Sequence, residues 1–117
     1  MQDKVIINDY IENDPLSENN LDRTLDLVNE FRLSMPQKSI WLYTGHTFID
    51  ILKGAAQIKD RSNLIRFMVL RNIDILVDGQ YIDSKRDLTL PYRGSNNQKL
   101  IDIQQSLRNG EIVLWQN

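Results

Sequence analysis

The stretch IWLYTG, residues 40–45, decides the fold of this chain. Residues 40–44 are all β-branched, aromatic or leucine, and such residues favour a strand. Both faces of that strand are apolar, which is typical of a parallel sheet buried on both sides. Gly45 ends the strand, and Thr47 can cap a helix that begins at Phe48. The stretch therefore predicts a strand that leads directly into a helix.

The same alternation continues on either side of this stretch. Strands alternating with helices are typical of βαβ units. We therefore predict an α/β fold, a mostly parallel sheet with alternating helices, in a single domain over residues 1–117. The expected elements are a strand at 5–7, a helix from 21 that ends at Met35-Pro36, a helix at 48–52 or beyond, a helix at 64–70 opened by Ser62 or Asn63, a strand at 73–77, a loop over 80–95, a helix over 98–107, and a last short strand or apolar tail at 112–115.

Composition excludes several classes of protein. The formal net charge is -2, so no basic stripe exists to bind nucleic acid. No apolar run approaches the roughly 20 residues of a membrane span, and the first residues lack the pattern of a signal peptide. We therefore expect a cytoplasmic protein without a membrane or nucleic-acid partner. The chain has no cysteine and one histidine, which excludes disulfides, thiolate zinc sites and protein-ligated iron–sulfur clusters, and no carboxylate cluster has metal-ligand spacing.

Polar residues follow the predicted parallel strands, where ligands usually bind in open α/β sheets and barrels. These strand ends are Asn8-Asp9, Thr44-Gly45-His46 and Asp78-Gly79. Gly45 allows a close backbone approach and Thr44 offers a hydroxyl, but the residues by themselves favour the simpler interpretation, a strand end followed by a helix cap. His46 has no nucleophile or carboxylate placed beside it by the sequence, so we predict no catalytic residue. Asp74, at the other end of its strand, is expected to be a cap or a solvated residue.

The segment LPYRGSNNQ, residues 90–98, is more unusual. A guanidinium beside a flexible, amide-rich turn suits the recognition of an anion or a carboxylate. The same groups could instead fix the loop through backbone hydrogen bonds, and both interpretations stay open. The residues concerned are Arg93, Gly94, Ser95, Asn97 and Gln98.

Taken together, several segments resemble the activating proteins of anaerobic ribonucleoside-triphosphate reductase, a radical S-adenosylmethionine family. The resemblance runs from Asp14 to Trp115 and leaves residues 1–13 as an atypical N-terminal segment. It rests on the combination of WLYTG, a strand that ends VDG, and RGSNNQ, in this order and spacing. The segments are DPLSENNLDRTLDLVNEF at 14–31, IWLYTGHTFIDIL at 40–52, NIDILVDGQYIDSKRDLTLPYRGSNNQKLIDIQQSL at 72–107 and EIVLW at 111–115.

The resemblance implies a function and a fold. Members of this family hold a [4Fe-4S] cluster through a CxxxCxxC motif, cleave S-adenosylmethionine reductively, and generate a glycyl radical on the large reductase subunit. Their fold is an open, partial (β/α) barrel. By this resemblance we expect Asp14, Thr44 and Gly45 to be the residues that contact S-adenosylmethionine, and the segment from Arg93 to Gln98 to face the reductase or to fix the loop.

The chain departs from the family at two places. The cysteine motif is absent, and the family's Gly-Gly-Asp-Pro turn is here Glu12-Asn13-Asp14-Pro15. Side chains at the two glycine positions are expected to crowd the methionine part of S-adenosylmethionine, and Glu12 brings a negative charge near its carboxylate. We expect that the chain was cut or recombined just upstream of Asp14. Ser17 or Asn20 is expected to cap the helix that follows.

Three functions are compatible with these residues. The first is the C-terminal part of the activase, inactive in this chain alone because no thiolate holds the cluster. The second is a non-catalytic binding module that docks on the reductase or complements a separate cluster-bearing fragment through an open sheet edge. The third is a gene remnant of marginal stability with no selected role.

Overall fold

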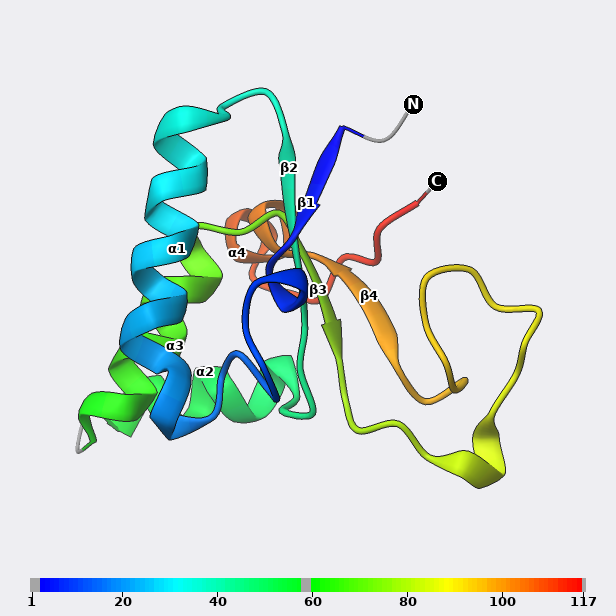
Figure 1. Ribbon diagram of the computed structural model, residues 1–117. Helices are drawn as coiled ribbons and strands as arrows, with labels where there is room; N and C mark the ends of the chain where they lie inside the picture. The colour runs from blue at the N-terminus through cyan, green and yellow to red at the C-terminus, as the bar shows by residue number, and fades with distance from the viewer. Residues whose placement is uncertain (1–2, 58–59, 117) are drawn as a thin grey trace.

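A four-stranded sheet forms the centre of the structure, a computed structural model that describes residues 3–57 and 60–116 (Figure 1). The strand order is β1-β2-β3-β4, with β1–β3 parallel and β4 antiparallel to β3. The α/β class is therefore confirmed, and the sheet is mixed rather than wholly parallel. The strands are β1 (Lys4–Ile6), β2 (Ser39–Tyr43), β3 (Ile75–Asp78) and β4 (Lys99–Asp102).

Helices connect the parallel strands and cover one face of the sheet (Figure 1). Helix α1 (Leu21–Ser34) joins β1 to β2, and α2 (Phe48–Gln57) and α3 (Arg61–Arg71) join β2 to β3. Helix α4 (Ile103–Asn109) follows β4 directly. Short 3-10 turns, η1 (Ile7–Asp9), η2 (Glu18–Asn20) and η3 (Asp83–Lys85), lie in the connections. No helix in the described ranges is both long enough and apolar enough to cross a bilayer.

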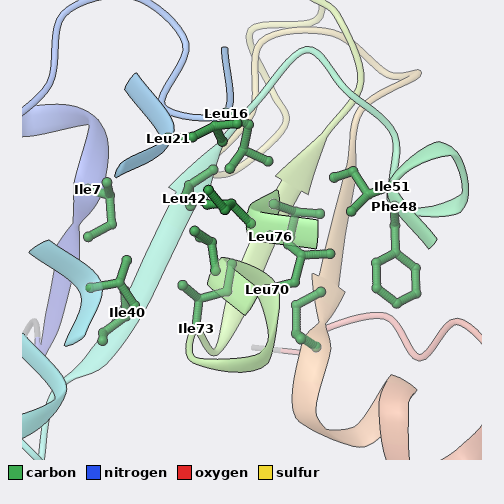
Figure 2. Close-up of a cluster of buried hydrophobic side chains, with 14 of the residues drawn as sticks. Ile7, Leu16, Leu21, Ile40, Leu42, Phe48, Ile51, Leu70, Ile73 and Leu76 are labelled. Atoms are coloured by element: carbon green, nitrogen blue, oxygen red, sulfur yellow. The ribbon is translucent and has the colours of Figure 1, made fainter. Parts of the chain in front are cut away.

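The main hydrophobic core lies between the sheet and these helices (Figure 2). Leu42 and Leu76 come from the two central strands, and Leu70 comes from α3; all three are fully buried. Ile7 and Leu16 fill the same core from the segment before α1. A second cluster, built around Trp41, Ile75, Val77 and Leu100, contains the alternate residues of the strands. Both faces of the central strands are therefore covered, as the apolar stretch at 40–44 predicts.

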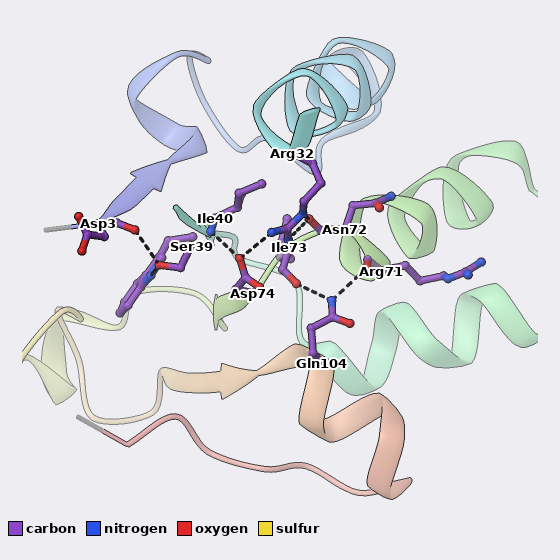
Figure 3. Close-up of polar contacts among 10 residues, drawn as sticks. Asp3, Arg32, Ser39, Ile40, Arg71, Asn72, Ile73, Asp74 and Gln104 are labelled. Atoms are coloured by element: carbon purple, nitrogen blue, oxygen red, sulfur yellow. Dashed lines mark hydrogen bonds and ion pairs between the residues drawn. The ribbon is translucent and has the colours of Figure 1, made fainter. Parts of the chain in front are cut away.

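A polar network closes the amino-terminal end of the sheet (Figure 3). Asp74 Oδ2 accepts a hydrogen bond from the Ile40 N–H at 2.8 Å and from Arg32 Nη1 at 3.2 Å. Arg32 Nε also donates to the Asn72 carbonyl at 3.2 Å. Asp74 was expected to be a cap or a solvated residue; its side chain is partly exposed, and its carboxylate also ties α1 to the start of β2.

The predicted helix over 98–107 is wrong in its first half. Residues 99–102 form β4, because Leu100 and Ile101 bury their side chains on opposite faces of the sheet, which requires a period of two. Asp102 then caps α4 by accepting from the Gln105 N–H at 3.1 Å. At 112–115 the chain pairs with β4 through an isolated bridge between Leu114 and Ile101 and two backbone hydrogen bonds, so the segment lies between the two predicted alternatives, a short strand and an apolar tail.

Two predicted helix caps also differ from the structure. Asp60, rather than Ser62 or Asn63, caps α3 by accepting from the Ser62 N–H at 2.9 Å. Ser17 and Asn20 make no side-chain cap. Asn20 instead donates from Nδ2 to the carbonyls of Glu12 and Asp14 at 2.9 and 3.0 Å. These bonds fold residues 12–20 into a tight turn ahead of α1.

Candidate functional site

Asp14 organises the carboxyl end of the parallel strands. Its Oδ2 accepts from the Gly45 N–H at 2.8 Å, and its carboxylate accepts from Thr44 Oγ1 at 2.9 and 3.0 Å. Its Oδ1 also accepts from the Leu16 N–H at 2.9 Å. Thr44 Oγ1 in turn accepts from the His46 N–H at 3.1 Å. The three residues expected to contact a cofactor, Asp14, Thr44 and Gly45, therefore lie together, although they are separated by 30 residues of chain.

The turn before Asp14 keeps a glycine-like backbone without glycine. Asn13 has a φ of 65°, in the left-handed region that glycine adopts freely and that asparagine tolerates better than most residues. Asn13 lines the pocket beside Asp14, whereas Glu12 is exposed and does not line it. The expected crowding therefore concerns Asn13, and the expected negative charge of Glu12 lies outside the pocket.

A polar pocket of about 240 Å³ opens between the strand ends and the loop that follows β3. Asn8 forms one wall by pairing with the backbone of Tyr43, donating from Nδ2 to its carbonyl at 2.9 Å and accepting from its N–H at 2.8 Å. Gly45 forms part of the floor, where an added Cβ would lie 3.1 Å from Gln80 Cγ. Sequence reasoning placed Asn8 at a strand end but did not select it as a site residue. The sequence signal that indicates Asn8 is its side-chain amide, directly after the strand predicted at 5–7.

Two other strand-end residues have structural roles. Asp78 is buried, and its Oδ2 accepts from the Phe48 N–H at 2.8 Å, which fixes the start of α2. Gly79 has a φ of 93° and donates from its N–H to the His46 carbonyl at 3.1 Å. The His46 side chain does not line the pocket.

The loop at 79–98 is fixed by its own amides. Gln98 Oε1 accepts from the N–H groups of Gly94 and Ser95 at 2.9 and 3.1 Å, and Gln98 Nε2 donates to the Gly79 carbonyl at 3.1 Å. Asn97 donates to the Gln80 carbonyl at 2.8 Å. Arg93 Nη1 donates to the Gln98 carbonyl at 3.2 Å. The five residues selected at 93–98 are therefore brought together, and most of their polar groups bind one another and the start of the loop, whereas the buried Arg93 Nε has no hydrogen-bond partner among the described residues.

Tyr43 connects this loop to the sheet. Its hydroxyl donates to the Tyr92 carbonyl at 2.7 Å. Burial raises the pKa of the Tyr43 hydroxyl above its usual value, and the nearby Tyr92 and Asp9 raise it further. The neutral hydroxyl, which can donate, is therefore the favoured form in the folded chain.

The family follows from a comparison with known proteins. The family model described as "4Fe-4S single cluster domain" matches residues 13–101, which include Asp14, the loop at 79–98 and every lining residue of the pocket except Asn8. The chain belongs to this 4Fe-4S single cluster domain family. No solved structure matches the chain.

Curated relatives in the comparison carry the name anaerobic ribonucleoside-triphosphate reductase-activating protein. The one from Vibrio cholerae is 38% identical over 85 residues, covering 73% of this chain and 48% of the relative. The one from Escherichia coli (strain K12) is 34% identical over 85 residues, which also cover 73% of this chain and 48% of the relative. The one from Enterobacteria phage T4 is 32% identical over 87 residues, 74% of this chain and 47% of the relative. The chain thus spans about half the length of the curated relatives it matches.

The residues of this chain do not fit the cluster that the family name describes. Protein-bound iron–sulfur clusters are held by cysteine thiolates, with histidine replacing some of them in one class. This chain has no cysteine and one histidine. Within residues 3–57 and 60–116, no group of three His, Asp or Glu side chains is arranged to hold a metal ion either. A cluster would therefore need ligands from outside this sequence.

Proposed function

We propose that this chain is a part of an activating protein for anaerobic ribonucleoside-triphosphate reductase, and that the chain alone does not cleave S-adenosylmethionine. The observation that carries the proposal is the match to a cluster-binding family by a sequence without cysteine. Reductive cleavage needs an electron from the cluster, because the cofactor rather than the protein supplies that chemistry. The mixed sheet of the structure corresponds, in this proposal, to one part of the open (β/α) barrel of the family.

We also propose that the strand-end pocket retains weak affinity for S-adenosylmethionine. Asn8, Asn13 and Thr44 line it with polar groups that suit the amino-acid end of that molecule. The volume of about 240 Å³ lies below the roughly 300–1,000 Å³ of pockets that enclose a whole small ligand, so only part of S-adenosylmethionine fits. When bound next to a cluster, this cofactor supplies an organic radical after reductive cleavage. Here Asp14 would hold the Gly45 backbone in place and leave the pocket open beside it.

The activity proposal is tested by electron paramagnetic resonance. The chain, the large reductase subunit, S-adenosylmethionine and a chemical reductant are mixed without oxygen. We expect no glycyl radical signal with this chain, and a signal when the Escherichia coli activating protein replaces it on the matching reductase. A radical signal produced by this chain alone would overturn the proposal.

A second candidate function is docking on the reductase without catalysis. The loop at 79–98 projects from the side of the sheet opposite α1–α3 (Figure 1). It exposes the apolar side chains of Tyr81, Ile82 and Leu88, and Leu88 is 85% exposed. Exposed apolar groups on a loop held rigid by its own hydrogen bonds favour a protein partner.

A matched pair of variants tests docking. Leu88→Asp places a charge on the loop, and Leu33→Asp places the same charge on α1, where Leu33 is 84% exposed. We expect the unmodified chain and the Leu33→Asp variant to retain the large reductase subunit in a pull-down at micromolar concentration, and Leu88→Asp to lose it. Equal retention by both variants, or none by the unmodified chain, would count against docking through this loop.

The outer edge of β1 supports complementation by a cluster-bearing fragment. Within the described residues, β1 pairs with β2 alone, and an open edge can accept another strand. Hydrogen exchange tests this idea: a cysteine-bearing fragment of a relative should slow exchange at residues 4–6. Unchanged exchange at saturating fragment would exclude pairing at this edge.

A further inference from the structure

A second pocket lies at the opposite end of the sheet from Asp14. Its volume is about 410 Å³, larger than that of the strand-end pocket. Lys4 and Asp74 line it from the amino-terminal ends of parallel strands, and Asp102 lines it from the end of the antiparallel β4. Among the residues that the structure describes, it shares no lining residue with the strand-end pocket proposed for S-adenosylmethionine, so an inference about it does not depend on that binding proposal.

Three aromatic rings form one wall of this pocket. Trp41 lies 5.0 Å from Trp115 and 5.3 Å from Tyr92, measured between ring centroids. Tyr92 and Trp115 are 5.6 Å apart in an edge-on arrangement. The ammonium of Lys4 lies 4.3 Å from the centre of the Trp41 ring and 4.1 Å from that of Tyr92. Both distances are within the range of a cation–π interaction, so the pocket already holds a cation from its own chain.

The backbone is strained to place one of these rings. Tyr92 has a φ of 65°, a left-handed conformation that is unfavourable for a bulky residue. The Tyr43 hydroxyl holds the Tyr92 carbonyl in this conformation at 2.7 Å. Where a loop needs a positive φ only to turn the chain, glycine is the usual residue, as at Gly79 and Gly110. The strain therefore indicates that the position of the Tyr92 ring has a use beyond joining two strands.

Carboxylates complete the cation-binding character of the pocket. Three carboxylates, those of Asp3, Asp74 and Asp102, contribute to the lining of the pocket. In the part of the chain that the structure describes, the lining contains one cationic side chain, that of Lys4. Asp74 uses Oδ2 for Arg32 and Ile40, and within the described residues its Oδ1 accepts no hydrogen bond. A flat cation could stack on the aromatic wall and donate to such an oxygen at the same time.

We propose that this pocket binds an organic cation of the guanidinium class, stacked on the Trp41 and Tyr92 rings in the place that the Lys4 ammonium occupies, so that Lys4 competes with it. A guanidinium fits better than an ammonium because it is planar and weakly hydrated, stacks on aromatic faces, and pairs with carboxylates through two donors. The Lys4 ammonium leaves the rings when the ligand enters. The ligand class is thus set by the rings and the carboxylates together.

Tryptophan fluorescence measures this binding directly, because both tryptophans of the chain belong to the aromatic wall. The probe is N-acetyl-arginine amide, whose only charge is the guanidinium, and the uncharged control ligand is N-acetyl-citrulline amide. We expect a saturable change with the arginine derivative alone. Removing the competing ammonium by Lys4→Met should tighten binding by roughly 2- to 30-fold, the range of one cation–π contact.

Two further variants test whether the fluorescence change comes from binding at the aromatic wall or from a change in the charge of the protein. Lys85→Met makes the same charge change on the exposed η3 turn and should bind like the unmodified chain. Trp115→Leu removes one ring from a peripheral position, leaves Trp41 as the reporter, and should weaken binding several-fold. The proposal is overturned by the absence of a saturable change in Lys4→Met at about 10 mM probe. An equal response to the citrulline derivative, or equal affinity with and without Lys4, would overturn it as well.

Discussion

Asp14 is the residue on which the geometry of the strand-end pocket depends most. Asparagine at this position retains one acceptor oxygen but loses the charge and the second acceptor, which serve Thr44 and Gly45. We predict that Asp14→Asn lowers the free energy of unfolding by about 1–3 kcal/mol, the cost of an unsatisfied hydrogen bond to a charged group. Urea denaturation measures this change. Asp26→Asn, at an exposed position of α1, is the control and should change stability by less than about 0.5 kcal/mol.

Tyr43 gives the chain a predicted dependence on alkaline pH. Its pKa is raised in the folded state, so the neutral form stabilises the fold fully below the unfolded value near 10. This contribution is lost as the pH rises through the folded pKa. Tyr43→Phe should lower the free energy of unfolding by about 1 kcal/mol at pH 7, because the hydrogen bond to the Tyr92 carbonyl is lost.

The pH profile of stability distinguishes this role from simple packing. Above pH 10 the Tyr43→Phe chain should lose less stability with rising pH than the unmodified chain. Tyr10→Phe is the matched control for the loss of a tyrosine hydroxyl at an exposed position. Parallel profiles for the unmodified chain and Tyr43→Phe would contradict the assignment.

Part of the candidate site could be predicted at this scale. Thr44 and Gly45 follow the strongest strand of the sequence, and Asp14 was selected through the resemblance; the structure brings the three together. Asn8 follows a predicted strand, but its pairing with the backbone of Tyr43, 35 residues away, is visible only in the structure. The left-handed backbone of Tyr92 has no signal in the sequence, since aromatic residues rarely adopt it.

At the scale of elements, Gln98 determines the conformation of the loop at 79–98. Its side chain accepts two hydrogen bonds from loop N–H groups and donates one to Gly79. We predict that Gln98→Ala opens the loop locally, so that limited proteolysis cuts within 79–98 several-fold faster. Gln105→Ala, at an exposed position of α4, should not change the cleavage rate. Equal rates for both variants would show that the loop has other anchors.

Helices and strands were predicted well where the apolar pattern fits only one type of secondary structure. Helix α1 and strands β2 and β3 follow from it, because 3.6-residue periodicity and continuous β-branched runs rarely arise otherwise. The error at 98–107 has a physical reason. A four-residue strand joined directly to a seven-residue helix gives a mixed pattern that a single helix also satisfies. Tertiary pairing with β3 decides between them.

At the scale of the whole molecule, the sheet separates two polar ends. The carboxyl end holds Asp14 and the strand-end pocket, and the amino end holds Asp74 and the aromatic pocket. Neither end supplies a thiolate, because the chain has none. Kinship with cluster-binding proteins and the ability to bind a cluster are therefore separate properties in this chain.

Anaerobic reconstitution with iron and sulfide tests this central claim most directly. The purified chain is incubated with iron and sulfide and then desalted. It is examined for bound iron and for the absorbance of a thiolate-ligated cluster at about 400 nm. The Escherichia coli activating protein is treated in parallel as the positive control. We predict no band and no stoichiometric iron for this chain. A band at about 400 nm that stays with the desalted chain would contradict the account.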